Sequence, residues 1–252
     1  MTADNKAALA RLFDMADAVL RDGYRGPDRD YVFFDDGEIP AAEKGAAADA
    51  PVPADSLETL AAEIGRCQAC SLHGGRKNAV PGEGAARPLV LVIGEGPGAE
   101  EDASGRPFVG KAGQLLDRML ASVGLYREKN CFIANTVKCR PPNNRDPLPE
   151  ETAACSRFLA RQIRLLNPKI ILCAGRIAAQ TMLRTRASMG SLRGSFVPYE
   201  AAEDLTIPLI ATYHPSALLR DDSYRRPAWE DLKLLRQRLA ELDSAYAAEG
   251  GP

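Results

Sequence analysis

Four short segments of the chain are apolar at most positions. They span residues 88–94, 131–137, 169–173 and 207–212 and are rich in Val, Ile and Leu. A segment that is apolar throughout, rather than at alternate positions, is typical of a strand buried on both faces of a parallel sheet. The pattern therefore predicts four buried strands in the second and larger part of the chain.

Apolar residues with helical spacing occupy the intervals between these strands. Ser56 is a typical N-cap for a first helix that runs towards Cys67. Further helices are expected at residues 112–123, at 149–166, from the third strand to Leu183, and at 227–243. Because strands and helices alternate, the sequence predicts an α/β sandwich around a mostly parallel sheet.

In sheets of this kind, ligands bind on the loops that follow the carboxyl ends of the strands. Three such loops, at residues 94–113, 135–146 and 213–219, carry unusual combinations of glycine, proline and polar residues. We expect these loops to meet at one edge of the sheet and to form the functional site.

The first 55 residues have a different pattern from the rest. Apolar residues have helical spacing over residues 5–21, which predicts a short amphipathic helix. Residues 22–55 are rich in Asp, Ala, Gly and Pro and bury too little to offset the entropy of ordering, so they are expected to be a linker. One apolar stretch, Tyr31–Phe34, leaves open that this segment docks on the body or on a partner. We therefore divide the chain into an N-terminal arm, residues 1–55, and a folded domain, residues 56–246.

Charge differs between the two ends of the chain. The 252 residues carry a formal net charge of −2, with 32 Lys and Arg against 34 Asp and Glu. Residues 1–60 hold 13 acidic and 6 basic residues, which leaves 21 acidic and 26 basic residues in residues 61–252. An acidic arm thus masks a mildly basic body, which permits contacts with phosphate groups without demonstrating them.

The sequence contains no predicted membrane-spanning or secretory segment. It has no stretch of about 18 consecutive apolar residues. Its N-terminus lacks a basic segment followed by an apolar core and a cleavage site. We therefore expect a cytoplasmic protein without a membrane partner. In that reducing compartment, the six cysteines are expected to be core residues or metal ligands rather than disulfides.

Four cysteines form a candidate metal-binding set, namely Cys67, Cys70, Cys139 and Cys155. Four thiolates suit either tetrahedral zinc or a [4Fe–4S] cluster, and their spacing does not choose between the two. The alternative is a redox-active CxxC pair, but a thioredoxin-type CxxC opens a helix, whereas this pair follows one. The two remaining cysteines lie inside predicted strands and are expected to be core residues: Cys131 and Cys173.

The loop after the first strand is rich in glycine, with Gly94-Glu-Gly-Pro-Gly98 followed by an acidic triplet, Glu100–Asp102. It resembles a dinucleotide-binding loop only superficially, because Pro97 removes a backbone donor and the triplet would repel a pyrophosphate. The stiff backbone instead suits contact with a planar ligand. Phe108 is a candidate stacking residue in this loop, and a core position is an equally good interpretation.

The other two loops carry residues suited to nucleic acid. Asn135, near the end of the second strand, supplies a paired donor and acceptor for a base edge, although a turn or cap role is the ordinary one. Arg140 and Arg145 lie in a stiff proline-rich loop and suit phosphate contact. His214, one of two histidines, opens a loop that continues into an apolar Ala-Leu-Leu. The other histidine, His73, has no comparable context.

Together these motifs resemble one family. The segments at 94–98 (GEGPG), 105–116 (GRPFVGKAGQLL), 134–147 (ANTVKCRPPNNRDP) and 214–219 (HPSALL), with the four cysteines, are similar to the family-4, iron–sulfur uracil-DNA glycosylases. The resemblance covers about residues 57–243. It implies a three-layer α/β/α sandwich with a central four-stranded, mostly parallel sheet. It also implies a monomeric enzyme that releases uracil from single- and double-stranded DNA in base excision repair. The cofactor that it implies is a [4Fe–4S] cluster held by Cys67, Cys70, Cys139 and Cys155.

The resemblance also assigns roles to individual residues. Asn135 would recognise the edge of a flipped uracil, Phe108 would stack on its ring, and His214 would donate to O2 of the departing base. Leu218 or Leu219 would fill the gap left in the duplex. We expect contacts with DNA at Arg140, Arg145, Ser216, Leu218 and Leu219.

The water-activating group is less defined by the motifs. Other branches of the superfamily carry an Asp in the first motif, where this chain has Gly96. Glu95 is the nearest carboxylate, either as a weak catalytic base or as a brace for the loop. Glu101 is expected to crowd the 5-methyl group of thymine and so exclude it. Two other functions fit less well: a covalent uracil-DNA binder, whose extra basic segment is missing after Gly110, and an electron-transfer iron–sulfur protein, which would leave Asn135 without a role.

Overall fold

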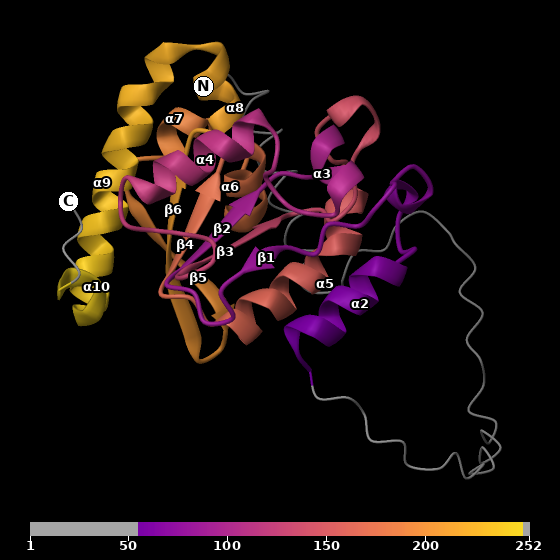
Figure 1. Cartoon of the computed structure of the whole chain (residues 1–252), viewed down its shortest axis with the longest axis horizontal. Helices are drawn as coiled ribbons and strands as arrows, with labels where there is room; N and C mark the ends of the chain where they lie inside the picture. The colour runs from indigo at the N-terminus through magenta and orange to yellow at the C-terminus, as the bar shows by residue number, and fades with distance from the viewer. Residues whose placement is uncertain (1–54, 249–252) are drawn as a thin grey trace, which may run out of the picture. The chain divides into compact units, whose positions relative to one another are not determined.

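The structure, a computed structural model, describes residues 55–248 and contains one six-stranded sheet within that range (Figure 1). Along the sheet the strands have the order β1-β3-β2-β4-β6-β5. The four inner strands, β3, β2, β4 and β6, are parallel, and both edge strands pair antiparallel with their neighbours. The strands are β1 (Glu83–Gly84), β2 (Val90–Gly94), β3 (Cys131–Asn135), β4 (Ile170–Ala174), β5 (Phe196–Ala202) and β6 (Leu205–Thr212).

The four predicted strands are the four parallel ones. Every residue of β2, β3 and β4 is buried, as expected for apolar runs covered on both faces. The two edge strands were not predicted, so the expected four-stranded sheet is wrong in its number of strands. β1 has only two residues, and β5 contains Pro198 and no fully buried residue, so neither has the apolar run that marks a central strand.

Helices cover both faces of the sheet, which gives the three layers that the resemblance implies (Figure 1). Helices α4 and α9 pack with α8 and α10 on one face, and α5 and α6 pack with α7 on the other. Helix α2 packs beside α5 in a third, smaller core. The helices are α2 (Leu57–Arg66), α3 (Ala99–Ser104), α4 (Lys111–Ala121), α5 (Pro149–Leu166), α6 (Arg176–Leu183), α7 (Met189–Leu192), α8 (Pro215–Arg220), α9 (Arg225–Leu242) and α10 (Ser244–Ala248).

Three short 3₁₀ helices complete the described elements: η1 (Ser71–Gly74), η2 (Pro142–Asn144) and η3 (Asp222–Tyr224). The predicted helix at residues 5–21 and the linker, except Asp55, lie outside the described residues, so the boundary near residue 55 stays a prediction. None of the helices that the structure describes is both long and apolar enough to cross a membrane.

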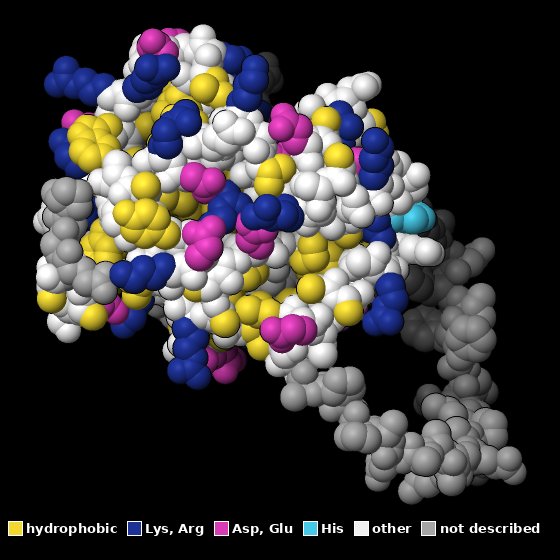
Figure 2. Space-filling view, viewed as in Figure 1, with side chains coloured by type: hydrophobic (Ala, Val, Ile, Leu, Met, Phe, Trp, Pro, Cys, Tyr) yellow, Lys and Arg dark blue, Asp and Glu magenta, His cyan; other side chains and the backbone are white. Residues whose placement is uncertain are grey.

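Charged side chains are interleaved on the face shown in Figure 2. Lys and Arg side chains are scattered over it among Asp and Glu side chains, and they do not gather into one continuous basic patch. Any contact with a polyanion on this face would therefore involve individual cations rather than a uniform positive surface.

Candidate functional site

The loops that follow β2, β3, β4 and β6 line one cleft of about 770 Å³ at the carboxyl edge of the sheet. Its walls include Glu95 and Gly96 after β2, Asn135 at the end of β3, and His214 after β6. The expected convergence of the three predicted loops is therefore confirmed. The loop after β4, which contributes Gly175 and Arg176, is an addition that the sequence analysis did not include.

The amide of Asn135 and the aromatic ring of Phe108 both line this cleft. Asn135 is the last residue of β3 and is 2% exposed. It pairs across the sheet with Gly94, the last residue of β2. A Cβ atom on Gly94 would lie 2.4 Å from Oδ1 of Asn135 and 2.5 Å from Cζ of Phe108, so only glycine permits this approach. Phe108 is 7% exposed and packs against the core, which confirms the core interpretation; it also lines the cleft, and its stacking role stays a prediction.

The oxygen of the Asn135 side chain is an unusual feature. Oδ1 is buried and accepts no hydrogen bond from any described residue. A buried acceptor without a donor costs about 1–3 kcal/mol, and native proteins contain few of them. This oxygen and the ring of Phe108 both come close to Cα of Gly94, and both residues line the cleft. Its position therefore indicates a ligand that carries a hydrogen-bond donor.

His214 lies opposite Phe108, with the ring centroids 5.6 Å apart and the planes tilted by 33°. Its Nδ1 accepts the backbone N–H of Ser216 at 3.1 Å and lies 2.8 Å from the Ser216 hydroxyl oxygen. Because Nδ1 is the acceptor, the proton of the neutral ring belongs on Nε2. Burial, and secondarily Arg220, lowers the pKa of His214 to about 4. The imidazole is therefore a neutral hydrogen-bond donor at physiological pH.

Glu95 supplies the carboxylate of the cleft that is suited to proton transfer. Burial, together with the negative charge of Asp146, raises the pKa of Glu95 to about 7, while Arg176 acts in the opposite direction. Arg176 also forms an ion pair with Asp146 at 2.8 Å. A carboxylate with a pKa near neutrality can accept a proton in a reaction and release it afterwards.

Glu101 braces the glycine-rich loop. Its Oε1 accepts the backbone N–H groups of Val109 at 2.9 Å and Gly110 at 3.0 Å, and its Oε2 accepts that of Gly98 at 3.1 Å. The acidic triplet that contains it forms the first turn of α3, where negative charge is favourable. The bracing role considered for Glu95 thus belongs to Glu101, whereas thymine exclusion by Glu101 stays a prediction.

The four predicted ligand cysteines line a second, small cavity, between the end of α2, the loop after β3, and α5. Arg76 donates to Sγ of Cys139 at 3.0 Å, and the backbone N–H of Lys138 donates to Sγ of Cys155 at 3.3 Å. Burial raises the pKa of Cys155 to about 11 and also raises that of Cys139, so thiolates at these positions require positive charge beside them. Cys131 and Cys173 lie in β3 and β4 and are fully buried, which confirms them as core residues.

A site for a single metal ion needs at least three ligand side chains that converge on one point. Among residues 55–248, no three His, Cys, Asp or Glu side chains are arranged to hold a single ion. The four cysteines line one cavity, where Arg76 donates to Sγ of Cys139 and Arg157 to Sγ of Cys67.

Comparison with known proteins agrees with this geometry. The model of the uracil DNA glycosylase superfamily matches residues 81–233. A type-4 uracil-DNA glycosylase of Saccharolobus solfataricus is 42% identical over 191 residues, covering 74% of this chain and 88% of that protein. One of Thermotoga maritima is 43% identical over 180 residues, covering 70% of this chain and 91% of that protein. This chain belongs to the type-4 uracil-DNA glycosylase family. A type-5 uracil-DNA glycosylase of Thermus thermophilus is more distant, at 34% identity over 155 residues, covering 54% of this chain and 68% of that protein.

Two of the residues expected to contact DNA in this type-4 family member make contacts within the protein itself. Leu218 is 3% exposed and packs in the core with α4 and α9, so it is not available as a wedge. Leu219, the next residue of α8, is 46% exposed. Arg145 forms a two-pronged ion pair with the buried Glu151, at 2.7 and 2.8 Å, so its charge is already compensated. Because Arg145 also lines the cleft, its expected phosphate contact stays a prediction.

The remaining predicted residues lie at or beside the cleft. Gly96 lies in its wall. Ser216 directs both its backbone N–H and its hydroxyl at His214, so it orients the imidazole. Arg140 donates through Nε to Asn144 within the loop after β3. Two tyrosines that were not predicted as site residues, Tyr213 and Tyr224, also line the cleft, and their ring centroids lie 4.5 Å apart. Tyr213 directly follows β6, so the strand-end rule alone would have included it.

Proposed function

We propose that this chain removes uracil from DNA by hydrolysing its N-glycosidic bond, which releases free uracil and leaves an abasic site. The observation that carries the proposal is the buried Oδ1 of Asn135, which has no donor among the described residues and lies beside Gly94, as the ring of Phe108 does, in a cleft that also contains a neutral imidazole. A flipped pyrimidine fits this arrangement, because enzymes that act on a base take it out of the helical stack.

Recognition of uracil follows from the polarity of the Asn135 amide. The unpaired Oδ1 accepts the N3–H of uracil, and the amide nitrogen donates to O4. Cytosine presents an acceptor at N3 and a donor at N4, so both groups would be opposed to the amide. In a dry pocket that mismatch costs on the order of a few kcal/mol. Phe108 supplies a face on which any pyrimidine ring stacks, so discrimination depends on the amide.

Cleavage depends on stabilising the departing base. As the bond between C1′ and N1 breaks, its electron pair moves onto uracil and negative charge builds on O2. The Nε2–H of His214 is positioned by Ser216 to donate to that oxygen. A neutral donor suffices, since it acts where the charge develops. Water then adds to C1′, and Glu95, with a pKa of about 7, accepts its proton.

The cysteine site suits a [4Fe–4S] cluster held by Cys67, Cys70, Cys139 and Cys155. When bound, such a cluster supplies a structural crosslink and a redox-active centre. The chain's own residues join the two sites: Cys139 lies four residues after Asn135, and the buried Lys138 donates through Nζ to the backbone carbonyl of Asn135 at 2.8 Å. A fixed cysteine site therefore supports the strand end that carries the recognition amide.

We further propose that the partner is uracil-containing DNA, single- or double-stranded, and that the protein acts as a monomer. The exposed Leu219 is the residue suited to enter the gap left by the flipped base. Arg145 and Arg220 line the cleft and suit phosphate contact, as does Arg140, which donates through Nε to the cleft residue Asn144.

The test is uracil release from a labelled oligonucleotide with one uracil, measured with the visible absorption spectrum of the same preparation. The wild-type protein is expected to release uracil and to leave an alkali-labile abasic site without cutting the strand. An Asn135→Ala variant with the same absorption spectrum should lose that activity. If a cluster-loaded wild-type preparation releases no uracil, the proposed function is wrong, and an electron-transfer role becomes the better explanation of the cysteines.

A further inference from the structure

The stacking residue has a strained backbone. Phe108 has a φ of +52°, in the left-handed region that bulky residues rarely adopt. Such a conformation persists only where the surrounding structure enforces it. Because the ring faces the cleft from this backbone, whatever enforces the conformation also sets the position of the ring.

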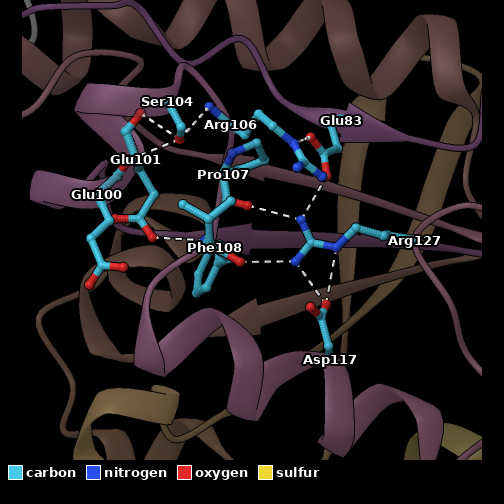
Figure 3. Close-up of polar contacts among 10 residues, drawn as sticks. Glu83, Glu100, Glu101, Ser104, Arg106, Pro107, Phe108, Asp117 and Arg127 are labelled. Carbon is cyan, nitrogen blue, oxygen red and sulfur yellow. Dashed lines mark hydrogen bonds and ion pairs between the residues drawn. The ribbon is translucent and has the colours of Figure 1, made fainter.

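Two charged side chains hold this backbone from opposite sides (Figure 3). On the side that follows Phe108 in sequence, Glu101 accepts the N–H groups of Val109 and Gly110. On the other side, Arg127 donates to the carbonyl oxygens of Pro107 and Phe108, each at 3.0 Å. The carbonyl and amide groups on both sides of the strained residue are thus fixed by charged partners, which make stronger hydrogen bonds than neutral ones.

Arg127 is itself fixed on all sides. It is 8% exposed and lies outside the lining of the cleft. Besides the two carbonyls, it donates through Nε and Nη2 to Asp117, at 3.1 and 2.7 Å, and through Nη1 to Glu83 at 2.8 Å. These five bonds use all five N–H donors of a guanidinium group. A lysine has three donors on one atom and cannot reproduce this pattern.

The first turn of helix α4 packs against the backbone of Phe108. A Cβ atom on Gly113 would lie 1.9 Å from the carbonyl oxygen of Phe108. Only glycine permits that contact, so the first turn of the helix limits movement of the strained peptide. The position of the ring is therefore determined by Arg127, Glu101 and Gly113 together.

We infer that Arg127 is a positioning residue for base recognition: it holds Phe108 in its left-handed conformation and so keeps the ring where a flipped base stacks. This inference rests on the proposed function and deepens it. Arg127 touches no substrate, and its effect on uracil passes through the carbonyls of Pro107 and Phe108. Nineteen positions separate Arg127 from Phe108 in the chain.

The test compares binding of two oligonucleotides by the full chain. One carries 2′-fluoro-2′-deoxyuridine, whose glycosidic bond resists cleavage, and the other carries a tetrahydrofuran abasic analogue, which has no base to stack. Arg127→Met is expected to weaken binding of the uracil oligonucleotide about tenfold and to leave binding of the abasic oligonucleotide unchanged. A general loss of structure would instead weaken both.

Arg106→Gln is the matched control. Arg106 is bonded to the same Glu83 at 2.7 and 2.9 Å, but its side chain is 59% exposed and bonds to neither carbonyl. It should bind both oligonucleotides as the wild type does. Asp117→Asn is a second test variant, because Asp117 is 48% exposed and its replacement loosens Arg127 without leaving a buried void. This variant should also bind the uracil oligonucleotide more weakly, by a smaller factor, and bind the abasic oligonucleotide as the wild type does. If Arg127→Met does not fold, this variant alone tests the inference.

A double-mutant cycle with Phe108→Ala tests whether the effect passes through the ring. If it does, Arg127→Met adds less than twofold once the ring is absent. Equal loss of both oligonucleotides, no loss in either variant, or full additivity with Phe108→Ala would overturn the inference. Each of those results leaves uracil release by the wild type intact, so they are distinguishable from failure of the proposed function.

Discussion

Replacing Asn135 by alanine should separate the stability of the fold from its activity. For most buried polar residues the two fall together, because the side chain has partners within the protein. The Oδ1 atom of Asn135 has no such partner among the described residues. Its loss therefore removes an unfavourable feature of the free protein together with the contacts proposed to recognise uracil.

The magnitudes follow from hydrogen-bond energies. A buried acceptor without a donor costs about 1–3 kcal/mol, which its removal recovers. The small cavity left by the truncated side chain offsets part of that gain. We therefore expect the free energy of unfolding to stay the same or to rise by about 1 kcal/mol. In the complex, two buried hydrogen bonds to uracil are lost at about 1–3 kcal/mol each, so kcat/KM should fall by about 30-fold to about 10⁴-fold.

The assay combines urea unfolding with uracil release from a labelled oligonucleotide. Tyr246→Phe is the control of opposite sign, because the buried Tyr246 hydroxyl donates to the carbonyl of Val123 on the far side of the molecule from the cleft residues. That variant should lose about 1 kcal/mol of stability and keep the wild-type kcat/KM. A loss of more than about 2 kcal/mol in Asn135→Ala, in parallel with its activity, would refute the reasoning and make Asn135 a structural residue.

Three further results are expected. If Glu95 accepts the proton of water, kcat should rise with pH through about 7. Asp146→Asn removes a negative charge that raises the pKa of Glu95, so it should move that rise to lower pH. A pH–rate profile of both proteins checks this. Arg145→Ala leaves the buried carboxylate of Glu151 without its cation and should lower the midpoint of urea unfolding, and it should reduce the salt dependence of DNA binding if Arg145 also contacts phosphate. Leu219→Ala should reduce excision from duplex DNA more than from single strands, whereas Leu218→Ala should lower stability by about 2–5 kcal/mol and affect both substrates alike.

The inner sheet was predictable because its signal is local. Each parallel strand contains a short run of apolar residues, which burial on both faces favours, although β3 ends in Asn135 and β6 in Thr212. The edge strands give no such signal. β5 faces solvent along one side and tolerates Pro198, and β1 is two residues long. Their pairing depends on neighbours that the sequence pattern does not identify.

That the proposed recognition residues would lie in one cleft was predictable for a related reason. Asn135 and His214 lie at or just beyond the ends of parallel strands, and the carboxyl ends of such strands necessarily meet at one edge of the sheet. The motif did not predict the orientation of single side chains. Successive residues of a helix point about 100° apart, so of the neighbours Leu218 and Leu219 only one faces solvent, and the motif did not show which.

The supports of the site had no local signal at all. Arg127 lies in the turn before β3, where an arginine is ordinarily a solvated surface residue. Its significance comes from five bonds to groups that the fold brings together, two of them to backbone carbonyls that every residue possesses. Motifs record side chains that contact the ligand, because such contacts need particular chemistry at a particular place. A strained backbone such as that of Phe108 indicates that a support must exist, yet φ angles become visible only in the folded chain. Strained residues that line a cleft are therefore a practical place from which to search for positioning residues that motifs do not reveal.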